Sequence, residues 1–240
     1  MFFKRNNFAK VDGVIVPPAA MRWGGPELKN DAYYLKSAES EALRIRDNLG
    51  YDSTKHILDI GCGQGRLPIG ILRTLGEAHY TGIDVHKPSI KWCKQYIEKA
   101  HPSFQFRHLN AFNERYSKSG LTIDDAFRFD IRADSVDIVY LYSVFTHMRQ
   151  EEMEIYLHDF KRILRKNGKI FFSAFFEEDV EDYVINPDDF HFKMNGPLHV
   201  VRYNTKYLYS ILEKHGYHRL DITEKNPRDN DGQQFIYLSR

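Results

Sequence analysis

The sequence predicts an α/β fold built on a doubly wound sheet of seven strands, mostly parallel, with one antiparallel strand in a C-terminal hairpin. Apolar strand-like runs alternate five times with helix-like segments, an order that is typical of parallel sheets. Two further strand-like runs then follow each other with only a loop between them, as in a hairpin. Three closely spaced glycines after the first strand indicate the turn at which such sheets bind ligands.

The N-terminal region is expected to be an arm followed by a helix. Residues 1–28 are rich in proline and glycine signals that break regular structure, including the pair Pro17-Pro18. From Asn30 to Leu49, apolar residues recur near helical spacing, and Gly50 stands where a C-terminal cap would lie. We therefore predict a loop or arm and then one helix before the first strand.

The remaining elements follow from periodicity and from the residues that stop it. The strands are expected at 56–60, 79–84, 104–109, 136–142, 169–176, 218–224 and 233–239. The helices between them are expected at 67–75, 88–100, 151–166 and 205–216. Two of the strands, 136–142 and 169–176, are nearly all apolar, which indicates central positions covered on both faces. Residues 110–135 show no clear pattern, and the polar stretch 177–204 interrupts the alternation.

Composition and charge argue against several classes of protein. The 34 basic and 33 acidic residues leave a formal charge of +1, and the basic residues are scattered, which disfavours a nucleic-acid-binding surface. No apolar run approaches the roughly 20 residues that a membrane helix needs. Cys62 and Cys93 are too few for a disulfide framework, and no secretory leader is recognised, so we expect unpaired cysteines and a cytoplasmic protein. No close-set metal-ligand pattern is present, so no metal is expected.

The glycine loop, residues 61–65, raises the question of which ligand approaches the backbone there. A strand, a glycine loop and a helix present backbone N–H groups and a positive helix end to a ligand. A dinucleotide site would read G-x-G-x-x-G, whereas Gly61, Gly63 and Gly65 are followed by Arg66 in the place of the last glycine. Asp59, directly before the loop, would repel a pyrophosphate. It would suit a cationic or amino-bearing ligand instead.

These residues resemble the first motif of the class I S-adenosylmethionine-dependent methyltransferases, an acid followed by G-x-G-x-G. DIGCGQG matches that motif, GIDVHKPSI resembles the second motif, and HLNAF resembles the third. SVDIVYLYSVFTHM and the following YLHDFKRILRKNGKIFFSAF resemble the fourth and fifth. Five pieces in the right order form a strong signal, although each alone is weak. The resemblance implies a Rossmann-like fold, S-adenosyl-L-methionine as the cofactor and methyl transfer as the reaction.

The resemblance also implies a set of cofactor-binding residues. They are Asp59, Gly61, Cys62, Gly63, Gly65, Asp84, Val85, Asn110, Ala111, Phe112, Tyr142 and Ser143. Asp84 would hold both ribose hydroxyls, although it could instead cap the next helix, and a dinucleotide-binding protein would also carry an acid there. Asn110 and Ala111 would lie beside the adenine, while Phe112 either stacks on the adenine or fills the core. Cys62 is expected to be a small packed residue rather than a nucleophile.

The methyl acceptor is expected near the end of the fourth strand. His147, in SVFTHM, could take a proton from a hydroxyl group as it attacks the methyl group, or it could serve only in packing. The candidate acceptor-binding residues are Trp23, Tyr34, His191 and His199; the histidines could equally belong to a plain surface loop. By analogy with related enzymes, the N-terminal arm would fold over the cofactor. Arg22, Trp23, Tyr33 or Tyr34 would then reach the cofactor or the acceptor.

The sequence thus predicts an S-adenosylmethionine-dependent methyltransferase that acts on a small molecule, with O-methylation favoured. The alternatives are N- or C-methylation of a metabolite, a protein or RNA, and a non-catalytic cofactor-binding module. The absence of DPPY or NPPY after the fourth strand weakens the case for a nucleobase amine acceptor. We expect one domain overall, with 1–50 covering the cofactor cleft, 51–240 forming the methyltransferase domain and 177–204 shaping the acceptor site. The oligomeric state is not predicted.

Overall fold

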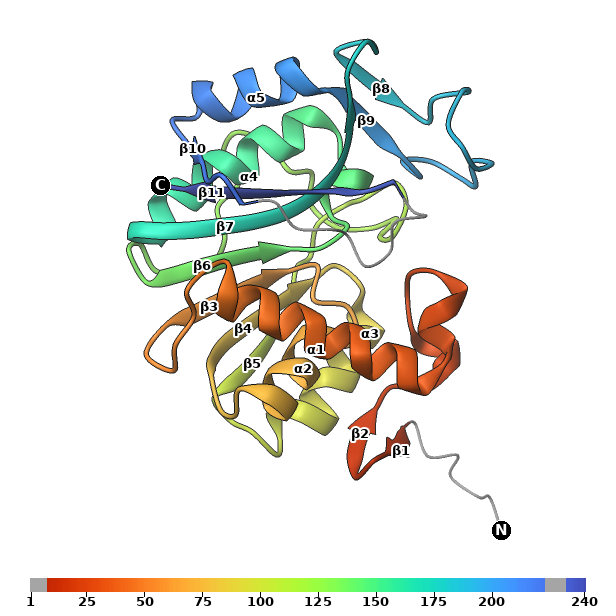
Figure 1. Ribbon diagram of the computed structural model, residues 1–240, viewed down its shortest axis with the longest axis vertical. Helices are drawn as coiled ribbons and strands as arrows, with labels where there is room; N and C mark the ends of the chain where they lie inside the picture. The colour runs from red at the N-terminus through yellow and green to blue at the C-terminus, as the bar shows by residue number, and fades with distance from the viewer. Residues whose placement is uncertain (1–7, 223–231) are drawn as a thin grey trace. The chain divides into compact units, whose positions relative to one another are not determined.

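A computed structural model describes residues 8–222 and 232–240, and these divide into two compact units. The first unit comprises residues 8–55 together with Cys62–Leu109. The second comprises His56–Gly61 with the described residues from 110 onward. Figure 1 shows the course of the chain. We describe each unit by itself.

The N-terminal arm of the first unit contains regular structure that the sequence did not indicate. β1 (Ala9–Val11) and β2 (Val14–Val16) form an antiparallel hairpin around Asp12 and Gly13, which both have positive φ. Short 3-10 turns follow at Ala19–Met21 and Pro26–Lys29. The expectation of an irregular arm was therefore wrong in part, because three-residue strands are too short to show an alternating pattern.

The helices of the first unit pack closely on each other. α1 (Asp31–Asp47) begins where the Asn30 side chain accepts a hydrogen bond from the Tyr33 N–H group, and its bounds confirm the predicted helix. α2 (Arg66–Thr74) meets α1 at Gly70, where an added Cβ atom would lie 1.9 Å from the Ala38 carbonyl oxygen. Only glycine permits this close approach of the two backbones.

The strands of the first unit are parallel, as predicted. β4 (His79–Asp84) pairs with β5 (Phe104–His108) in register from Tyr80 with Phe104 to Asp84 with His108. The connection between them begins as α3 (Lys87–Cys93) and continues as a π-helical turn over Lys94–Glu98. In place of the single helix expected at 88–100, the structure has an α-helix followed by a π-helical turn.

The sheet of the second unit has the strand order β10-β11-β7-β6-β3. β3 (His56–Ile60), β6 (Val136–Leu141) and β7 (Leu164–Glu177) pair in parallel. β11 (Gln234–Ser239) is antiparallel to β7 and forms a hairpin with β10 (His218–Arg219). The predicted α/β class, with a mostly parallel sheet and a terminal antiparallel hairpin, is confirmed. Of the strand expected at 218–224, only His218–Arg219 is formed, and its last two positions lie outside the described residues.

Two helices and two extra strands complete the second unit. α4 (Gln150–Ile163) passes directly into β7 at Leu164, so the helix ends before the predicted position 166. Within the expected insert, β8 (Tyr183–Ile185) pairs with β9 (Val201–Asn204), and β9 extends the end of β7 in parallel. α5 (Thr205–Lys214) lies beside α4, where Tyr207 and Gln150 are joined by hydrogen bonds (Figure 1).

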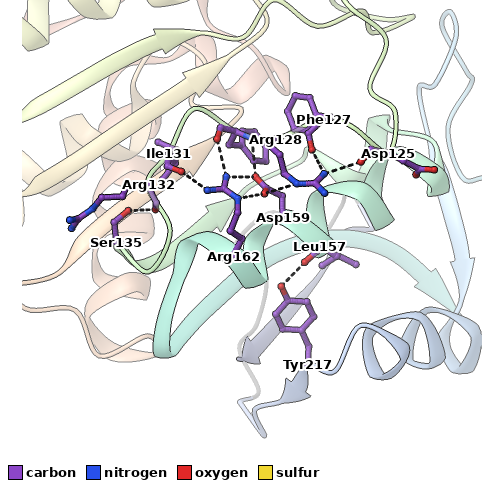
Figure 2. A network of polar contacts seen from close by, with 11 residues as sticks. Asp125, Phe127, Arg128, Ile131, Arg132, Ser135, Leu157, Asp159, Arg162 and Tyr217 are labelled. Atoms are coloured by element: carbon purple, nitrogen blue, oxygen red, sulfur yellow. Dashed lines mark hydrogen bonds and ion pairs between the residues drawn. The ribbon is translucent and has the colours of Figure 1, made fainter.

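An ion pair between a buried carboxylate and a partly exposed arginine holds the segment before β6, for which the sequence showed no pattern. The Asp159 side chain of α4 is completely buried and accepts a hydrogen bond from the Phe129 N–H group at 2.8 Å. Arg162 donates to Asp159 at 2.6 Å and to the Ile131 carbonyl oxygen at 2.7 Å (Figure 2). Because a buried carboxylate is tolerated only when it is paired and hydrogen-bonded, this network fixes the segment on α4.

Candidate functional site

Two glycines of the loop, Gly63 and Gly65, lie in the first unit and have different surroundings. Gly63 and Gly65 both have left-handed backbone angles, with φ of 52° and 78°. A Cβ atom on Gly65 would lie 2.6 Å from the Ile97 side chain, so glycine is needed there for packing. A Cβ atom on Gly63 would meet nothing within 4 Å. The backbone at Gly63 therefore borders open space that a ligand could enter.

Asp84 stands at the end of β4 and holds the glycine loop. One carboxylate oxygen accepts a hydrogen bond from the Gly63 N–H group at 2.8 Å, and the other accepts from the His86 N–H group at 2.7 Å. Burial raises the pKa of Asp84, and the two backbone hydrogen bonds oppose that rise. Each carboxylate oxygen has a second lone pair, so the group can accept two further hydrogen bonds. Val85 follows, and its carbonyl oxygen lies 3.1 Å from His108 Nε2.

The N-terminal arm contacts this part of the first unit through Trp23. The backbone N–H group of Trp23 lies 3.4 Å from Gln64 Oε1. The indole ring of Trp23 packs edge-on against the His86 ring, with the ring centres 5.2 Å apart. Gln64 and His86 both contact the Ser89 hydroxyl group, at 3.1 and 2.7 Å. The Trp23 side chain itself is 51% exposed. An exposed aromatic ring thus lies beside the turn that Asp84 organises.

The other arm residues differ strongly in their surroundings. Arg22 is buried and donates to the carbonyl oxygens of Pro17 and Leu28 at 2.9 and 3.1 Å, so it fastens the arm. Its guanidinium group lies over the Tyr34 ring at 4.5 Å from the ring centre. The Tyr34 hydroxyl group is buried and has no hydrogen-bond partner among the described residues. Burial also raises the pKa of Tyr34. A buried hydroxyl group without a partner is costly, and a bound ligand could satisfy it.

Several predicted cofactor residues lie in the second unit. Asp59 is buried in β3, in register with Tyr140 of β6. Gly61 has φ of 75°, and an added Cβ atom there would meet a Val144 methyl group at 2.5 Å. Phe112 is 36% exposed, so it does not fill the core.

Asn110 and Ala111 are packed against the neighbouring loop of the second unit. The Asn110 carbonyl oxygen accepts a hydrogen bond from the Leu121 N–H group at 3.0 Å. Ala111 is buried, and an added Cβ atom on Gly120 would lie 2.5 Å from its carbonyl carbon. The backbone here is held close to Gly120, which fixes the position of both residues.

Tyr142 and Ser143, at the end of β6, have separate surroundings. The Tyr142 ring packs near Phe171 and Phe235, with ring centres 6.2 and 5.9 Å away. Ser143 has a left-handed backbone with φ of 59°, and its N–H group donates to the Ser173 hydroxyl group at 2.7 Å. This hydrogen bond supports a backbone conformation that residues other than glycine seldom adopt.

His147 is half-buried and has a defined orientation. Its Nδ1 atom lies 3.0 Å from the Leu198 carbonyl oxygen, which favours the neutral tautomer with the proton on Nδ1. Its Nε2 atom faces the Ser143 hydroxyl oxygen at 3.4 Å. Burial lowers the pKa of His147 to about 4, and the positive charge of Arg115 adds to that effect. His147 is therefore neutral near pH 7 and presents a lone pair on Nε2, which can accept a proton.

The two histidines of the insert belong to an aromatic cluster formed by Phe190, His191, Phe192 and His199. The rings of Phe192 and His199 lie 5.3 Å apart, and His191 contacts both phenylalanines. His199 Nδ1 accepts a hydrogen bond from the Asn195 N–H group at 2.7 Å. Burial lowers the pKa of His199, and the positive charge of Arg115 adds to that effect.

Sequence reasoning missed three polar residues that surround Ser143. Thr146 and Ser173 are completely buried, and Gln233 is 8% exposed. Thr146 lay within the motif SVFTHM, but no local signal joined the other two to it. Ser173 and Gln233 reach Ser143 only because β6, β7 and β11 are paired in the fold.

Other features of the described residues are simple. Both cysteines are free and buried, and an added Cβ atom on Gly82 would lie 2.9 Å from the sulfur atom of Cys62. No group of three or more metal-ligating side chains is found in residues 8–222 and 232–240. Over the same residues, no helix is long and apolar enough to cross a membrane.

The sequence matches a family model described as a methyltransferase domain over residues 57–168. A relative in Mycobacterium ulcerans (strain Agy99), described as a probable phthiotriol/phenolphthiotriol dimycocerosates methyltransferase 2, is 28% identical over 118 residues. That match covers 48% of this chain and 38% of the relative. The chain thus matches well under half of the length of this curated relative.

Solved structures share the fold at low sequence identity. The 1,6-didemethyltoxoflavin-N1-methyltransferase of Burkholderia thailandensis aligns over 98% of this chain and 99% of its own, with a TM-score of 0.58 and 14% identity. The magnesium protoporphyrin IX methyltransferase of Synechocystis PCC 6803 aligns over 92% and 88%, with a TM-score of 0.58 and 13% identity. Residues 57–168 thus match a methyltransferase domain, and the motifs and the shared fold support the resemblance to the class I S-adenosylmethionine-dependent methyltransferases.

Proposed function

We propose that the protein transfers the methyl group of S-adenosylmethionine to a hydroxyl group of a small molecule. The observation that carries this proposal is His147, a neutral histidine whose Nε2 lone pair faces the Ser143 hydroxyl group. When bound, the cofactor supplies a methyl group on a positively charged sulfur atom, which is already activated for transfer. The chain then has to align the acceptor, exclude water and remove one proton.

The first unit supports cofactor binding through three features. Gly63 borders open space, so a ligand can approach its backbone. Asp84 keeps free acceptor capacity on both carboxylate oxygens, and we assign it to the two ribose hydroxyl groups. The Tyr34 hydroxyl group is buried without a partner among the described residues, and a polar group of the cofactor or the acceptor would satisfy it. Trp23 would then cover the bound molecule, as the arm was predicted to do.

The remaining cofactor contacts stay predictions from the motifs. Asp59 is assigned to an amino-bearing or cationic part of the ligand, and Asn110 with Ala111 to the adenine. The partly exposed Phe112 ring supports stacking on the adenine. Gly61, Cys62, Gly65, Val85, Tyr142 and Ser143 complete the proposed set.

The low pKa of His147 bears on the type of acceptor. A histidine with a pKa of about 4 is a weak base, so it removes a proton most readily from an acidic hydroxyl group. Phenols and enols are more acidic than simple alcohols. The aromatic cluster that includes His191 and His199 would pack against a planar acceptor of this kind. We therefore favour a phenol-like acceptor over an aliphatic alcohol.

The proposed reaction is tested with cofactor that carries an isotopic label in its methyl group. The purified protein is incubated with labelled S-adenosylmethionine and a small-molecule extract of the source cells, and the products are analysed by mass spectrometry. We expect a small molecule with one added labelled methyl group on oxygen, together with S-adenosylhomocysteine. Label on nitrogen or carbon would contradict O-methylation, and label in protein or RNA would contradict a small-molecule acceptor. No transfer would favour a non-catalytic cofactor-binding module.

The cellular setting is also a proposal. Cys62 and Cys93 are free and buried, which suits a reducing compartment, and we propose the cytoplasm. Measuring the redox state of both thiols in freshly lysed cells would test this, since an oxidised pair would contradict it.

A further inference from the structure

We infer that Ser143, Ser173 and Gln233 form a hydrogen-bonded ring that fixes which nitrogen of His147 carries the proton. This inference rests on the proposed function, because it concerns the histidine proposed to act as the base. In this view Gln233 is a positioning residue. It acts through Ser143 and does not itself contact the acceptor.

The ring closes through three hydrogen bonds within the second unit. The Ser143 N–H group donates to Ser173 Oγ at 2.7 Å. Ser173 Oγ donates to Gln233 Oε1 at 2.7 Å, and Gln233 Nε2 donates back to Ser143 Oγ at 3.2 Å. The three side chains come from the end of β6, from β7 and from the residue before β11. The strand pairing of the sheet thus brings them together.

Chemistry fixes the direction of each hydrogen bond in this ring. The Ser143 N–H group can only donate and the Gln233 carbonyl oxygen can only accept, so Ser173 Oγ accepts from Ser143 and donates to Gln233. The Gln233 amide group must then donate to Ser143 Oγ. The Ser143 hydroxyl hydrogen remains, and His147 Nε2 at 3.4 Å is a neighbour that can only accept in this tautomer. Thr146 Oγ1 lies 3.2 Å from Ser143 Oγ, and either of these two hydroxyl groups can be the donor.

Burial makes this arrangement obligatory for the residues involved. Ser173 and Thr146 are completely buried and Gln233 is nearly so. Buried polar groups are almost always hydrogen-bonded, because leaving one unpaired is costly. Each member of the ring therefore holds its neighbour in one orientation.

The consequence for His147 is a single neutral tautomer. The Leu198 carbonyl oxygen takes the Nδ1 proton from one side, and the Ser143 hydroxyl group offers its hydrogen to Nε2 from the other. The 3.4 Å contact is long for a hydrogen bond, so an acceptor hydroxyl group can displace Ser143 from Nε2. Gln233 thereby keeps the reactive nitrogen unprotonated until the acceptor arrives.

The test replaces Gln233 and measures the protonation of the two His147 ring nitrogens by nitrogen NMR, in the full-length protein without any ligand. In the wild type, we expect the proton on Nδ1. In Gln233→Glu, the carboxylate can only accept, so Ser143 would turn its hydrogen toward it and present a lone pair to Nε2. We expect both ring nitrogens to become protonated more readily, with the His147 pKa raised by about one unit, which is a tenfold change in proton affinity.

A neutral variant separates this effect from simple charge. Gln233→Met keeps the length of the side chain but removes both hydrogen bonds, and we expect a mixture of the two neutral tautomers. The matched control is Gln234→Met, because the neighbouring Gln234 side chain bonds to the Phe176 carbonyl oxygen and is exposed. The charged groups that face His147, Arg115 and His199, are unchanged in all variants.

The outcomes distinguish this inference from the proposed function. A tautomer mixture in Gln233→Met but not in Gln234→Met would support the ring, whether or not an acceptor is known. An unchanged Nδ1–H tautomer in Gln233→Met would overturn the inference, since the hydrogen bond to Leu198 alone would then fix the tautomer of His147. If Gln233→Met does not fold, Ser143→Ala is read in the same way, because it removes the hydroxyl group that meets Nε2. Failure of methyl transfer with an intact ring would count only against the proposed function.

Discussion

The glycine loop with Asp84 and the turn with Ser143 and His147 both follow strand ends, yet they are built in opposite ways. The first uses backbone N–H groups, and its parts lie within about twenty residues of one another. The second joins the backbone and side chain of Ser143, just after β6, to side chains of Ser173 in β7 and Gln233 before β11, which are far apart in the sequence. The proposed cofactor half is therefore encoded in a local motif, whereas the proposed acceptor half depends on correct strand pairing.

The largest expected effect tests whether the proposed acceptor half affects the rate of methyl transfer without affecting cofactor binding. His147→Gln removes the proposed base, and we expect kcat to fall by about 100-fold or more. The affinity for S-adenosylmethionine, measured by calorimetry, should stay unchanged. The control is His158→Gln, since His158 lies on the exposed face of α4. An equal loss of cofactor affinity in His147→Gln would show that the two halves are not separate.

Asp84→Ala tests the cofactor half in the same manner. Two backbone N–H groups lose their acceptor, and the ribose would lose the partner proposed for it. We expect cofactor affinity to fall by about 100-fold and the free energy of unfolding to fall by about 2 to 4 kcal/mol. Titration calorimetry and urea unfolding measure the two changes. Wild-type affinity would remove Asp84 from the site.

The two glycines of the loop offer a sharper comparison. Gly65→Ala should lower the free energy of unfolding by about 2 to 3 kcal/mol, because the added methyl group meets Ile97 in a left-handed backbone. Gly63→Ala should cost only about 1 kcal/mol, because the surrounding space is open. We nevertheless expect Gly63→Ala to weaken cofactor binding by roughly tenfold. Similar cofactor affinity in Gly63→Ala and the wild type would mean that the ligand does not approach this backbone.

The smallest effect concerns the pH dependence of stability. The pKa of His147 is about 4 in the folded protein, below its ordinary value of 6.5, so the unfolded chain binds this proton more tightly. The contribution of His147 to the free energy of unfolding is therefore present above pH 6.5 and is lost as the pH falls toward about 4. Urea unfolding at pH 7 and pH 5 should show a smaller difference for His147→Gln than for the wild type. An identical pH dependence would mean that the pKa of His147 is not lowered.

Much of the fold could be predicted because its signals are local. The alternation of apolar strands and amphipathic helices gave the order of elements and the terminal hairpin. The β1–β2 hairpin was missed because its strands are too short for a pattern. The segment before β6 showed no periodicity, because it is held by the ion pair of Asp159 and Arg162 rather than by an apolar face.

In the candidate site, too, the features with local sequence signals could be predicted and those that depend on tertiary contacts could not. Gly63, Gly65 and Asp84 lie in recognisable motifs, so their neighbourhood could be foreseen. His147 could be named as a candidate from its place after the fourth strand. The tautomer and the low pKa of His147 could not be predicted from the sequence, because they depend on Leu198, on Ser143 and on burial.

The most direct measurement is a calorimetric titration of the wild-type protein with S-adenosylmethionine and, separately, with NAD. Asp59 before the glycine loop and Arg66 after it were the features that favoured a sulfonium methyl donor over a dinucleotide. We predict that S-adenosylmethionine binds at one site per chain and that NAD does not bind. Binding of NAD without binding of S-adenosylmethionine would contradict the account.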